Sequence, residues 1–523
     1  MNERKASILW VDDEVDLLKS HIMFLEERGY KVKPVANGED AVGLIGREQF
    51  DLVLLDQMMP GMDGLTTFAR IKEKNPALPV VMITKLEEEE LIDEALRKRI
   101  DDFLLKPINP VQILSAARRI LESREIRQRE LSREFVEDFN AIEAQRASAS
   151  TPAEWIDIHT RLSEWDLVLD EFPDTGLAQS HLDQRRQCNI EFGMFVEKYY
   201  KGWVAERAPD GRPILSVDVI ARYVAPHISL GTRVYFIVVD CLRLDQWLTI
   251  EPMLEPYFSL ARDCYYSILP TATPYSRNAI FGGLFPSEIA SNYPEFWHES
   301  DSEEMGRNRH EKQLLERQLK KMGLKVAPSI KYLKIYSADE AIQARKQIPT
   351  LQNVPLVALV FNFVDIVAHS RSESRVLQEM LPNEAAYRSF TRSWFMHSPL
   401  YDILKAIALQ DAVVILTTDH GSVLAKRSAM TLGDRETSTN VRYKFGTNLN
   451  SDPRYAMQIK NPAEYKLPST GINKNYIIAK EDYYFVYPTN FHEYERQYKD
   501  SFQHGGISLE EMILPCVTMK PKR

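Results

Sequence analysis

The sequence predicts an α/β protein built from two α/β domains with a helical segment between them. In the first part of the chain, apolar runs alternate with amphipathic stretches, as in a parallel sheet covered by helices. The middle part is highly charged and has a helical period, and after Gly211 apolar strands rich in Val and Ile return. We therefore expect domains at residues 1–120, 121–205 and 206–523 of the 523-residue chain.

Four short apolar runs are expected as strands of the N-terminal domain, at residues 8–11, 52–55, 80–83 and 102–105. Runs of this length and composition are typical of strands that are buried on both faces of a parallel sheet. Residues 16–28 follow the first run with helical periodicity. The alternation predicts a sheet with helices between its strands.

The middle of the chain is expected to form helices. Residues 111–146 have the pattern of one long charged helix, which the sequence Ala-Ser-Ala-Ser at 147–150 breaks. Thr151-Pro-Ala-Glu154 is a capping box with proline in the first turn, so a second helix begins there. A third helix is expected over about residues 177–200. This segment is either a spacer or a relay, because a rigid helical joint can transmit a rearrangement but need not.

Three apolar runs in the last part of the chain are expected as strands, at residues 234–239, 356–364 and 412–416. Each run leads into an acidic residue, namely Asp240, Asp365 and Asp419. In parallel α/β sheets, ligands gather at the carboxyl ends of the strands. We therefore expect these three carboxylates along one edge of one sheet.

The composition narrows the class of protein. Hydrophobic residues make up 44% of the chain and charged residues 27%, which is ordinary for a globular protein with large buried cores. The formal net charge of −10 argues against binding of a polyanion such as DNA over the whole protein surface. It is compatible with a local basic groove. No helix-turn-helix pattern or basic recognition helix is found.

Cysteine use and hydropathy predict the compartment. The four cysteines form no Cys-x-x-Cys motif, so neither a disulfide framework nor a thiolate zinc site is expected. Residues 1–10 lack the apolar stretch of a signal peptide. The most apolar run, residues 354–367, is too short and too polar to span a bilayer. We expect a cytoplasmic protein without membrane insertion.

Polar side chains at the strand ends of the first domain predict a phosphoacceptor site. Asp12 and Asp13 follow the first strand, and Asp56 follows the second. Three carboxylates at adjacent strand ends make an oxygen site suited to Mg²⁺. Asp56 would attack an incoming phosphoryl group, Thr84 would hydrogen-bond the product, and Lys106 would pair with it.

This residue set, with Lys106 followed by Pro107, resembles the flavodoxin-like receiver domain of two-component response regulators over about residues 5–120. The resemblance implies that Asp12, Asp13 and Asp56 bind Mg²⁺. It also implies that Asp56 accepts phosphate from a sensor histidine kinase.

One metal site is expected from Asp365, His369 and His504. Asp365 and His369 are four residues apart, so one helical turn places both on one side. His504 lies in Gln-His-Gly-Gly, where the glycines let the backbone approach closely. Carboxylate and imidazole together suit Zn²⁺. These three side chains would leave a coordination position open for a substrate.

A second metal site is expected from Asp240, Asp419 and His420. The adjacent Asp419 and His420 suit a turn after a strand, and Gly421 relieves the geometry of that turn. The six ligands together are sufficient for two Zn²⁺ ions bound side by side.

The nucleophile is expected in the loop at residues 269–278, which opens into a helix that ends near Gly283. A hydroxyl at a helix N-terminus faces backbone N–H groups that favour phosphate. Near a metal ion the hydroxyl loses its proton more readily and attacks phosphorus. Thr271 and Thr273 are both candidates. Pro274 has no N–H to offer a phosphate oxygen, so Arg277 or Asn278 either substitutes for it or is a solvated helix residue.

These motifs resemble the alkaline phosphatase superfamily over about residues 206–523, and the PglZ group within it through Val-Asp-Cys-Leu-Arg-Leu-Asp at 239–245. The resemblance implies one Zn²⁺ on Asp365, His369 and His504, and a second on the other three ligands and the nucleophile. In this superfamily the nucleophile precedes a helix-ending glycine by about ten residues. That spacing selects Thr273 as nucleophile and zinc ligand, with Thr271 as the fallback. Because threonine cannot become formylglycine, sulfatase activity is not expected.

Two further features keep alternative interpretations. Arg243 and Asp245 belong to the PglZ pattern and either orient Asp240, contact substrate or form a structural ion pair. The segment between Gly421 and His504 is rich in Tyr and Lys, which either stack on nucleotides or pack in strands.

Receiver, helical middle and PglZ-type domain, in that order, resemble the PorX-like family of response regulators along essentially the whole chain. The resemblance implies control of type IX secretion, a PorY-like sensor kinase, contacts with a sigma factor and secretion components, and phosphodiesterase action on oligonucleotide or cyclic nucleotide substrates.

Our hypothesis is a zinc-dependent phosphodiesterase or phosphatase that phosphorylation controls through a homodimer formed around residues 85–108. The alternative is a phospho-dependent adaptor for a sigma factor with structural metals and no turnover.

Overall fold

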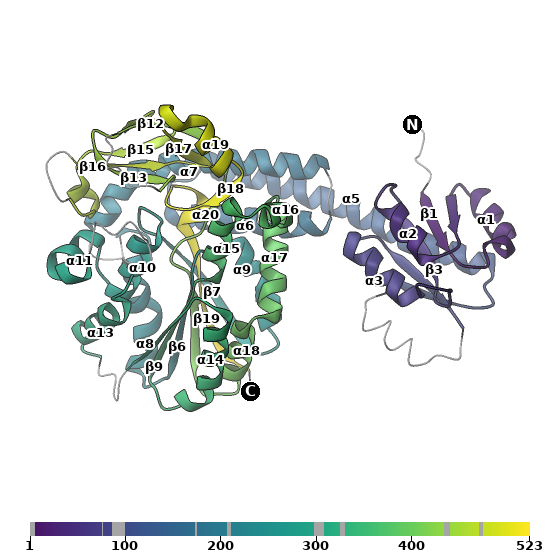
Figure 1. Ribbon diagram of the computed structural model, residues 1–523, viewed down its shortest axis with the longest axis horizontal. Helices are drawn as coiled ribbons and strands as arrows, with labels where there is room; N and C mark the ends of the chain where they lie inside the picture. Colours follow the sequence, from purple (N-terminus) through teal and green to yellow (C-terminus); the bar gives the residue numbers. More distant parts are fainter. Residues whose placement is uncertain are drawn as a thin grey trace. The chain divides into compact units, whose positions relative to one another are not determined.

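The computed structural model describes residues 6–75, 77–85, 100–172, 175–206, 211–297, 308–324, 330–433, 440–469 and 474–522 (Figure 1). The chain divides into two compact units, Met1–Asp138 and Phe139–Arg523. Among the described residues, no helix has both the length and the apolar character that a bilayer span requires.

A five-stranded parallel sheet forms the centre of the first unit, in the order β2-β1-β3-β4-β5. The strands are β1 (Ser7–Val11), β2 (Lys31–Val35), β3 (Leu52–Asp56), β4 (Val80–Thr84) and β5 (Asp102–Leu105). This order is that of a flavodoxin-like fold, as predicted. Strand β2 was not predicted, because Lys31, Lys33 and Pro34 interrupt its apolar pattern, as edge strands allow.

Helices cover both faces of this sheet. They are α1 (Lys19–Glu26), α2 (Gly38–Ile45), α3 (Gly64–Lys74) and α5 (Pro110–Ser148), and a short 3₁₀ helix, η1 (Val15–Leu18), precedes α1. Alternate residues of β1 pack on opposite faces of the sheet. Leu9 packs in one core with Ala41 of α2 and Phe68 of α3, whereas Ile8 packs in the other with Leu25 of α1.

A six-stranded sheet forms the centre of the second unit, in the order β7-β19-β10-β6-β9-β8. The strands are β6 (Val234–Val239), β7 (Phe258–Tyr266), β8 (Lys331–Ile335), β9 (Leu356–Phe361), β10 (Val413–Thr417) and β19 (Ile513–Pro521). The four strands from β10 to β8 are parallel. Strand β19 runs antiparallel to β10 and β7. The carboxyl ends of the parallel strands therefore share one edge, where ligands of such sheets gather.

Helices also cover both faces of the large sheet. On one face, Tyr235 and Ile237 of β6 pack with α9 (Leu244–Leu254), α14 (Ala338–Gln347), α17 (Glu384–His397) and α18 (Pro399–Ala408). On the other face, Phe236 of β6 packs with α10 (Thr273–Gly282) and α13 (Glu311–Lys321). The arrangement is a three-layer α/β sandwich.

The helices α6 (Pro152–Glu171) and α7 (Thr175–Ala205) contribute to the core of the second unit. The predicted capping box begins α6: the backbone N–H of Thr151 donates to Glu154 Oε2 at 2.9 Å, and Glu154 N–H donates back to Thr151 Oγ1. Trp155 of α6 and Phe192 of α7 pack together in that core with ring centroids 5.5 Å apart.

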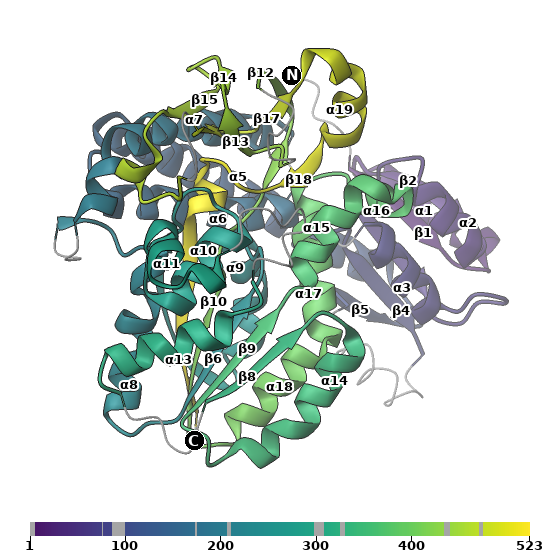
Figure 2. The same ribbon diagram turned by 60° about the vertical axis from the view of Figure 1, so that its left-hand side comes forward.

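Small sheets lie at one end of the large sheet (Figures 1 and 2). They are formed by β11 (Val423–Ala425) with β18 (Ser501–Gln503), by β12 (Arg427–Leu432), β14 (Asn450–Ser451) and β17 (Tyr483–Val486), and by β13 (Tyr443–Thr447), β15 (Ala456–Ile459) and β16 (Lys474–Ala479). Helices α19 (Phe491–Tyr498) and α20 (Leu509–Met512) flank β18 in the sequence.

One predicted strand boundary was wrong. The strand expected over residues 356–364 ends at Phe361, and Phe363 begins α15 (Phe363–Glu373). Asp365 therefore lies in the first turn of a helix and not at the end of a strand. The apolar run continues through both elements, and such a run does not distinguish a strand from the buried start of a helix.

Candidate two-metal site and phosphoacceptor site

Three of the predicted ligands lie at the carboxyl ends of two neighbouring strands. Asp240 follows β6, whereas Asp419 and His420 follow β10, and these strands are parallel with Thr417 opposite Val238. His420 Nε2 is 3.5 Å from Asp240 Oδ1 and 3.8 Å from Asp419 Oδ2. Ligand atoms of all three side chains lie within 4.8 Å of one another. We call this group the Asp240 site.

The other three predicted ligands form a second group, which we call the Asp365 site. Asp365 and His369 lie one turn apart on α15, and His504 directly follows β18. Asp365 Oδ1 is 3.4 Å from His369 Nε2 and 3.6 Å from His504 Nε2, and the two Nε2 atoms are 2.9 Å apart. His369 has a side chain that is 41% exposed, so solvent reaches the Asp365 site from its side.

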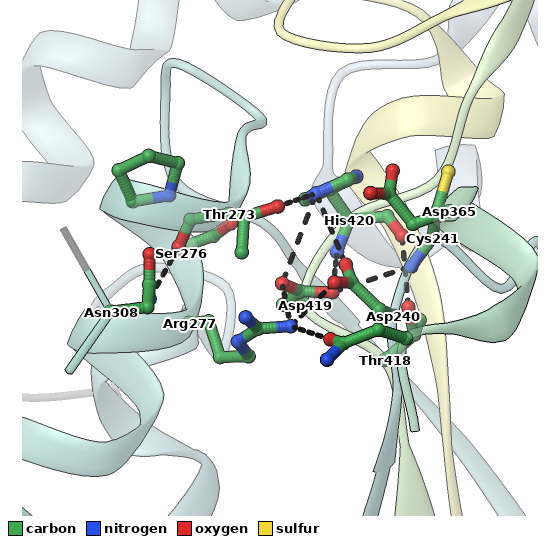
Figure 3. Close-up of polar contacts among 12 residues, drawn as sticks. Asp240, Cys241, Thr273, Ser276, Arg277, Asn308, Asp365, Thr418, Asp419 and His420 are labelled. Carbon is green, nitrogen blue, oxygen red and sulfur yellow. Dashed lines mark hydrogen bonds and ion pairs between the residues drawn. The ribbon is translucent and has the colours of Figure 1, made fainter. Parts of the chain in front are cut away.

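The hydroxyl of Thr273 points at the Asp240 site. Thr273 is the first residue of α10, and its Oγ1 lies 2.9 Å from His420 Nε2 (Figure 3). The other candidate is oriented differently, since Thr271 Oγ1 donates to the backbone carbonyl of Gly506 at 2.7 Å. Pro274 occupies the first turn of α10, where a missing N–H leaves no helical hydrogen bond unmade.

The donor atoms of both groups fit zinc. Two ligand atoms about 2.1 Å from a tetrahedral Zn²⁺ lie roughly 3.4 Å apart. The carboxylate oxygen and imidazole nitrogen are 3.4 Å apart for Asp365 and His369 and 3.5 Å apart for Asp240 and His420. Among the described residues, buried oxygens of Asp240, Asp365 and Asp419 have no hydrogen-bond partner. The ring of His420 lies with Nδ1 3.1 Å from the carbonyl of Gly421, a contact that orients a histidine to present Nε2 to a metal.

The carboxylates are crowded in a buried place. Burial raises the pKa of Asp240 well above its usual value, and the charges of Asp419 and Asp365 add to this rise while Arg277 opposes it. Burial likewise raises the pKa of Asp419. Burial also acts to raise the pKa of Asp365, but His369, His504 and His420 together outweigh it and hold that pKa below its usual value. This concentration of negative charge favours a bound cation.

Arg277 and Asn278 are not solvated helix residues, because they are 3% and 1% exposed. Arg277 Nη1 donates to Asp240 Oδ2 at 2.5 Å, and Asn278 Nδ2 donates to the carbonyl of Pro274 at 3.0 Å. The helix therefore directs a guanidinium at the carboxylate of a candidate ligand.

Arg243 forms an ion pair with Asp245, which was one of the three alternatives for these residues. Its Nε and Nη2 donate to the two carboxylate oxygens at 2.9 and 2.7 Å, and its Nη1 donates to Glu384 at 2.8 Å. Among the tyrosines between Gly421 and His504, Tyr443 and Tyr476 are each 2% exposed. Their burial favours a packing role.

The first unit assembles the predicted phosphoacceptor site. Ligand oxygens of Asp12, Asp13 and Asp56 lie within 4.8 Å of one another, as a magnesium site requires. Lys106 Nζ lies 3.0 Å from Asp56 Oδ2 and 3.3 Å from Asp12 Oδ2. Burial raises the pKa of Asp56 although Lys106 opposes it. Thr84 ends β4 and is buried.

Residues 86–99, which include most of the segment expected to form the dimer face at 85–108, lie outside the described residues.

Three buried residues near the Asp240 site were missed by sequence reasoning, namely Asn308, Glu311 and Asn362. Glu311 begins α13 and Asn308 lies in the turn just before it, and both are far from every motif. Asn362 directly precedes α15 and had only its position beside the ligand motif as a signal.

Three family descriptions match consecutive parts of the chain. The response regulator receiver domain matches residues 8–118, the PorX response regulator linker domain matches residues 125–204, and the BREX system PglZ alkaline phosphatase-like domain matches residues 219–519. The last match covers more than half of the 523 residues.

Curated relatives match a smaller part of the chain. The transcriptional regulatory protein ResD of Bacillus subtilis (strain 168) is 35% identical over 120 residues, which are 23% of this chain and 49% of ResD. The transcriptional regulatory protein ZraR of Salmonella typhimurium is 38% identical over 105 residues, which are 20% of this chain and 24% of ZraR. The chain thus spans about half the length of these relatives or less.

Solved structures of receiver domains are also similar. A CheY-like receiver domain protein from Methanospirillum hungatei is 28% identical, covers 24% of this chain and 99% of its own, and has a TM-score of 0.23. The receiver domain of NtrX from Brucella abortus is 34% identical, covers 22% of this chain and 98% of its own, and has a TM-score of 0.21.

Proposed function

The chain belongs to the PglZ alkaline phosphatase-like family and, with its receiver and linker, matches a PorX-like response regulator; from this premise we propose that its output is a two-zinc phosphodiesterase. The substrates we propose are nucleotide or oligonucleotide phosphodiesters.

The contact between Thr273 and His420 carries this proposal. A hydroxyl at the first position of a helix lies 2.9 Å from an imidazole nitrogen that itself faces two buried carboxylates. A purely structural metal site has no need of a hydroxyl directed at its ligands. A nucleophile needs such a position, because a metal beside the hydroxyl favours loss of its proton.

The reaction proposed here has two displacements. Thr273 Oγ1 loses its proton to solvent and attacks phosphorus, a P–O bond to the threonine forms, and the bond to the leaving alcohol breaks as that alcohol gains a proton from solvent. Water then attacks the phosphothreonine diester, restores the hydroxyl and releases the phosphate monoester. Zinc held by the Asp240 and Asp365 sites would neutralise charge on the phosphoryl oxygens and lower the pKa of the threonine hydroxyl.

Asp56 supplies the regulatory input in this proposal. A sensor histidine kinase of the PorY type phosphorylates it, with Mg²⁺ held by Asp12, Asp13 and Asp56. Phosphorylation then promotes a homodimer, and the protein regulates type IX secretion together with a sigma factor and secretion components.

The test is hydrolysis of bis-p-nitrophenyl phosphate by the full chain with zinc, compared with the chain after chelation. We expect turnover only with zinc. Failure to hydrolyse any phosphodiester or monoester would sink the enzyme proposal. The adaptor interpretation would then be favoured, and its signature is binding of a sigma factor that depends on phosphorylation of Asp56 and is indifferent to Thr273.

A further inference from the structure

Glu311 is a fully buried carboxylate that none of the metal-binding motifs contains. It is the first residue of α13 and is 1% exposed. Arg277 Nε donates to its Oε1 at 2.6 Å. Its other oxygen accepts from the hydroxyl of Tyr332 and lies 3.1 Å from Lys334 Nζ.

Arg277 connects this carboxylate to the Asp240 site. Its Nη1 donates to Asp240 Oδ2 at 2.5 Å and to Asn362 Oδ1 at 3.0 Å, and it lies 3.8 Å from Asp419 Oδ2. Figure 3 shows the guanidinium directed at both aspartates from the helix that carries Thr273. One side chain therefore joins Glu311 to two candidate metal ligands.

Asn308 connects the same carboxylate to the nucleophile. Its Nδ2 lies 3.1 Å from Glu311 Oε1 and 3.2 Å from both the backbone carbonyl of Thr273 and Asn278 Oδ1. Asn308, in the turn before α13, thus contacts the first turn of α10 at the residue whose hydroxyl faces His420.

The charges explain why a carboxylate is needed at this position. A guanidinium cannot lose its proton, so a buried one needs carboxylate partners. A cation in the Asp240 site would be bound by the carboxylate of Asp240, which also accepts a hydrogen bond from Arg277. Glu311 is the carboxylate partner of Arg277 that belongs to neither group of candidate ligands, so it limits the competition between the guanidinium and the cation for Asp240.

We infer that Glu311 is a positioning residue for the Asp240 site, acting through Arg277 on the metal ligands and through Asn308 on Thr273. The catalytic part of this inference rests on the proposed function, whereas the metal-binding part is tested without turnover.

The experiment uses the full chain with Glu311→Gln, which keeps the shape and removes the charge. A His369→Ala background weakens the Asp365 site, so zinc competition against a chromogenic chelator measures the Asp240 site. We expect zinc affinity there to fall by roughly 10-fold or more, as for other residues that orient metal ligands. In an Asp240→Asn background, affinity of the Asp365 site should stay unchanged.

The matched control is Glu251→Gln. Glu251 lies on α9 and its Oε2 is 2.8 Å from Arg262 Nη1, so this variant also removes one negative charge from an ion pair. It should leave both zinc affinities unchanged. In chains with both sites loaded, kcat of Glu311→Gln should fall while KM stays within about twofold, since Glu311 does not touch substrate.

Equal losses at both sites, or none at either, would overturn the inference. Should Glu311→Gln fail to fold, Tyr332→Phe removes only a hydroxyl that donates to Glu311, and the same comparison applies: a loss confined to the Asp240 site supports the inference, and any other pattern overturns it. A wild-type chain that binds two zinc ions without turnover would refute the proposed function and leave this zinc test intact.

Discussion

Thr273 Oγ1 lies 2.9 Å from His420 Nε2, whereas Thr271 Oγ1 donates to the backbone carbonyl of Gly506. Two threonines that are two residues apart therefore have different tasks. Thr273 is the first residue of α10 and faces the Asp240 site. Thr271 connects the loop before α10 to the segment that carries His504, through its hydrogen bond to Gly506.

Replacing Thr273 by valine should lower kcat for bis-p-nitrophenyl phosphate about a thousandfold or more, because the attacking hydroxyl is lost while the shape of the side chain is kept. Zinc bound at the Asp365 site should remain. Thr271→Val is the matched control. It should lower the free energy of unfolding by about 1–3 kcal/mol, through loss of one buried hydrogen bond, and keep most of the activity. The reverse pattern of activities would assign the reaction to Thr271.

Zinc should stabilise the second unit, since a ligand that binds only the folded chain shifts unfolding by mass action. At a free zinc concentration about 100 times Kd, the gain is roughly 3 kcal/mol for one site. Differential scanning fluorimetry before and after chelation measures it. Metal analysis should find two zinc ions per chain, and one in His369→Ala, whose half-exposed side chain leaves the core intact. Two ions in both proteins would contradict the ligand assignment.

An acyl-phosphate mimic with Mg²⁺ should shift the full chain toward a dimer. Asp56 is buried, and its Oδ2 lies 3.0 Å from Lys106 Nζ. A phosphoryl group on Asp56 would therefore form an ion pair with this lysine in place of the carboxylate. Size-exclusion chromatography with light scattering gives the mass. Asp56→Ala should remain unshifted, and Asp51→Ala, which changes an acid just before the same strand, should behave as the wild type. Identical profiles for Asp56→Ala and the wild type would refute this switch.

Four of the five strands of the first sheet were predicted from the sequence, but only β6, β9 and β10 of the six strands of the second sheet were. The six candidate metal ligands were also found in the sequence, and the structure brings them together in two groups of three. Strand ends that terminate in acids, as at Asp240, and histidines in glycine turns, as at His504, are local signals. Parallel pairing of β6 with β10 brings Asp240 close to Asp419 and His420. His504 follows β18, which pairs with β11 outside the large sheet, so its approach to Asp365 depends on tertiary packing.

The residues that support the site were not accessible in the same way. Glu311 reaches Arg277 only because α13 packs against α10, and no periodicity or motif encodes that pairing. Asp365 was placed at the end of a strand because its apolar run does not show where β9 stops. Tertiary packing decides both questions.

The sequence also left open whether the middle helices are a spacer or a relay. In the structure, Asn189 of α7 accepts from the backbone N–H of Leu509 at 2.8 Å and donates to Glu510, which also accepts from Arg185 at 2.8 Å. Leu509 and Glu510 begin α20, shortly after His504. The contacts couple a helix of the middle segment to the loop that carries a candidate zinc ligand.

Asn189→Ala should therefore weaken zinc binding at the Asp365 site and lower turnover by roughly tenfold. Its own cost in stability is about 1–3 kcal/mol, because buried polar groups lose their partners. Gln187→Ala, on the exposed side of the same helix, serves as the control. Zinc affinity and turnover like those of the wild type would show that α7 acts only as a spacer.

A buried histidine in α6 should make the second unit sensitive to acid. His159 is 1% exposed, and neither of its ring nitrogens has a hydrogen-bond partner among the described residues. Burial lowers its pKa to about 4 from an ordinary value of 6.5. The nearby charges of Glu510 and Arg185 act in opposite directions and leave burial as the main cause.

Because the pKa of His159 is lower in the folded chain, the unfolded chain binds more protons between pH 6.5 and pH 4, and the free energy of unfolding falls as the pH falls through this window. The loss is roughly 3 kcal/mol when the window has been crossed, and none is expected above pH 6.5. His159→Leu removes this titration, so the difference in unfolding free energy between variant and wild type should grow in favour of the variant below pH 6.5. Urea denaturation at several pH values measures it, with the exposed His492→Gln as control. A difference that does not depend on pH would show that His159 is protonated in the folded chain as readily as in the unfolded one.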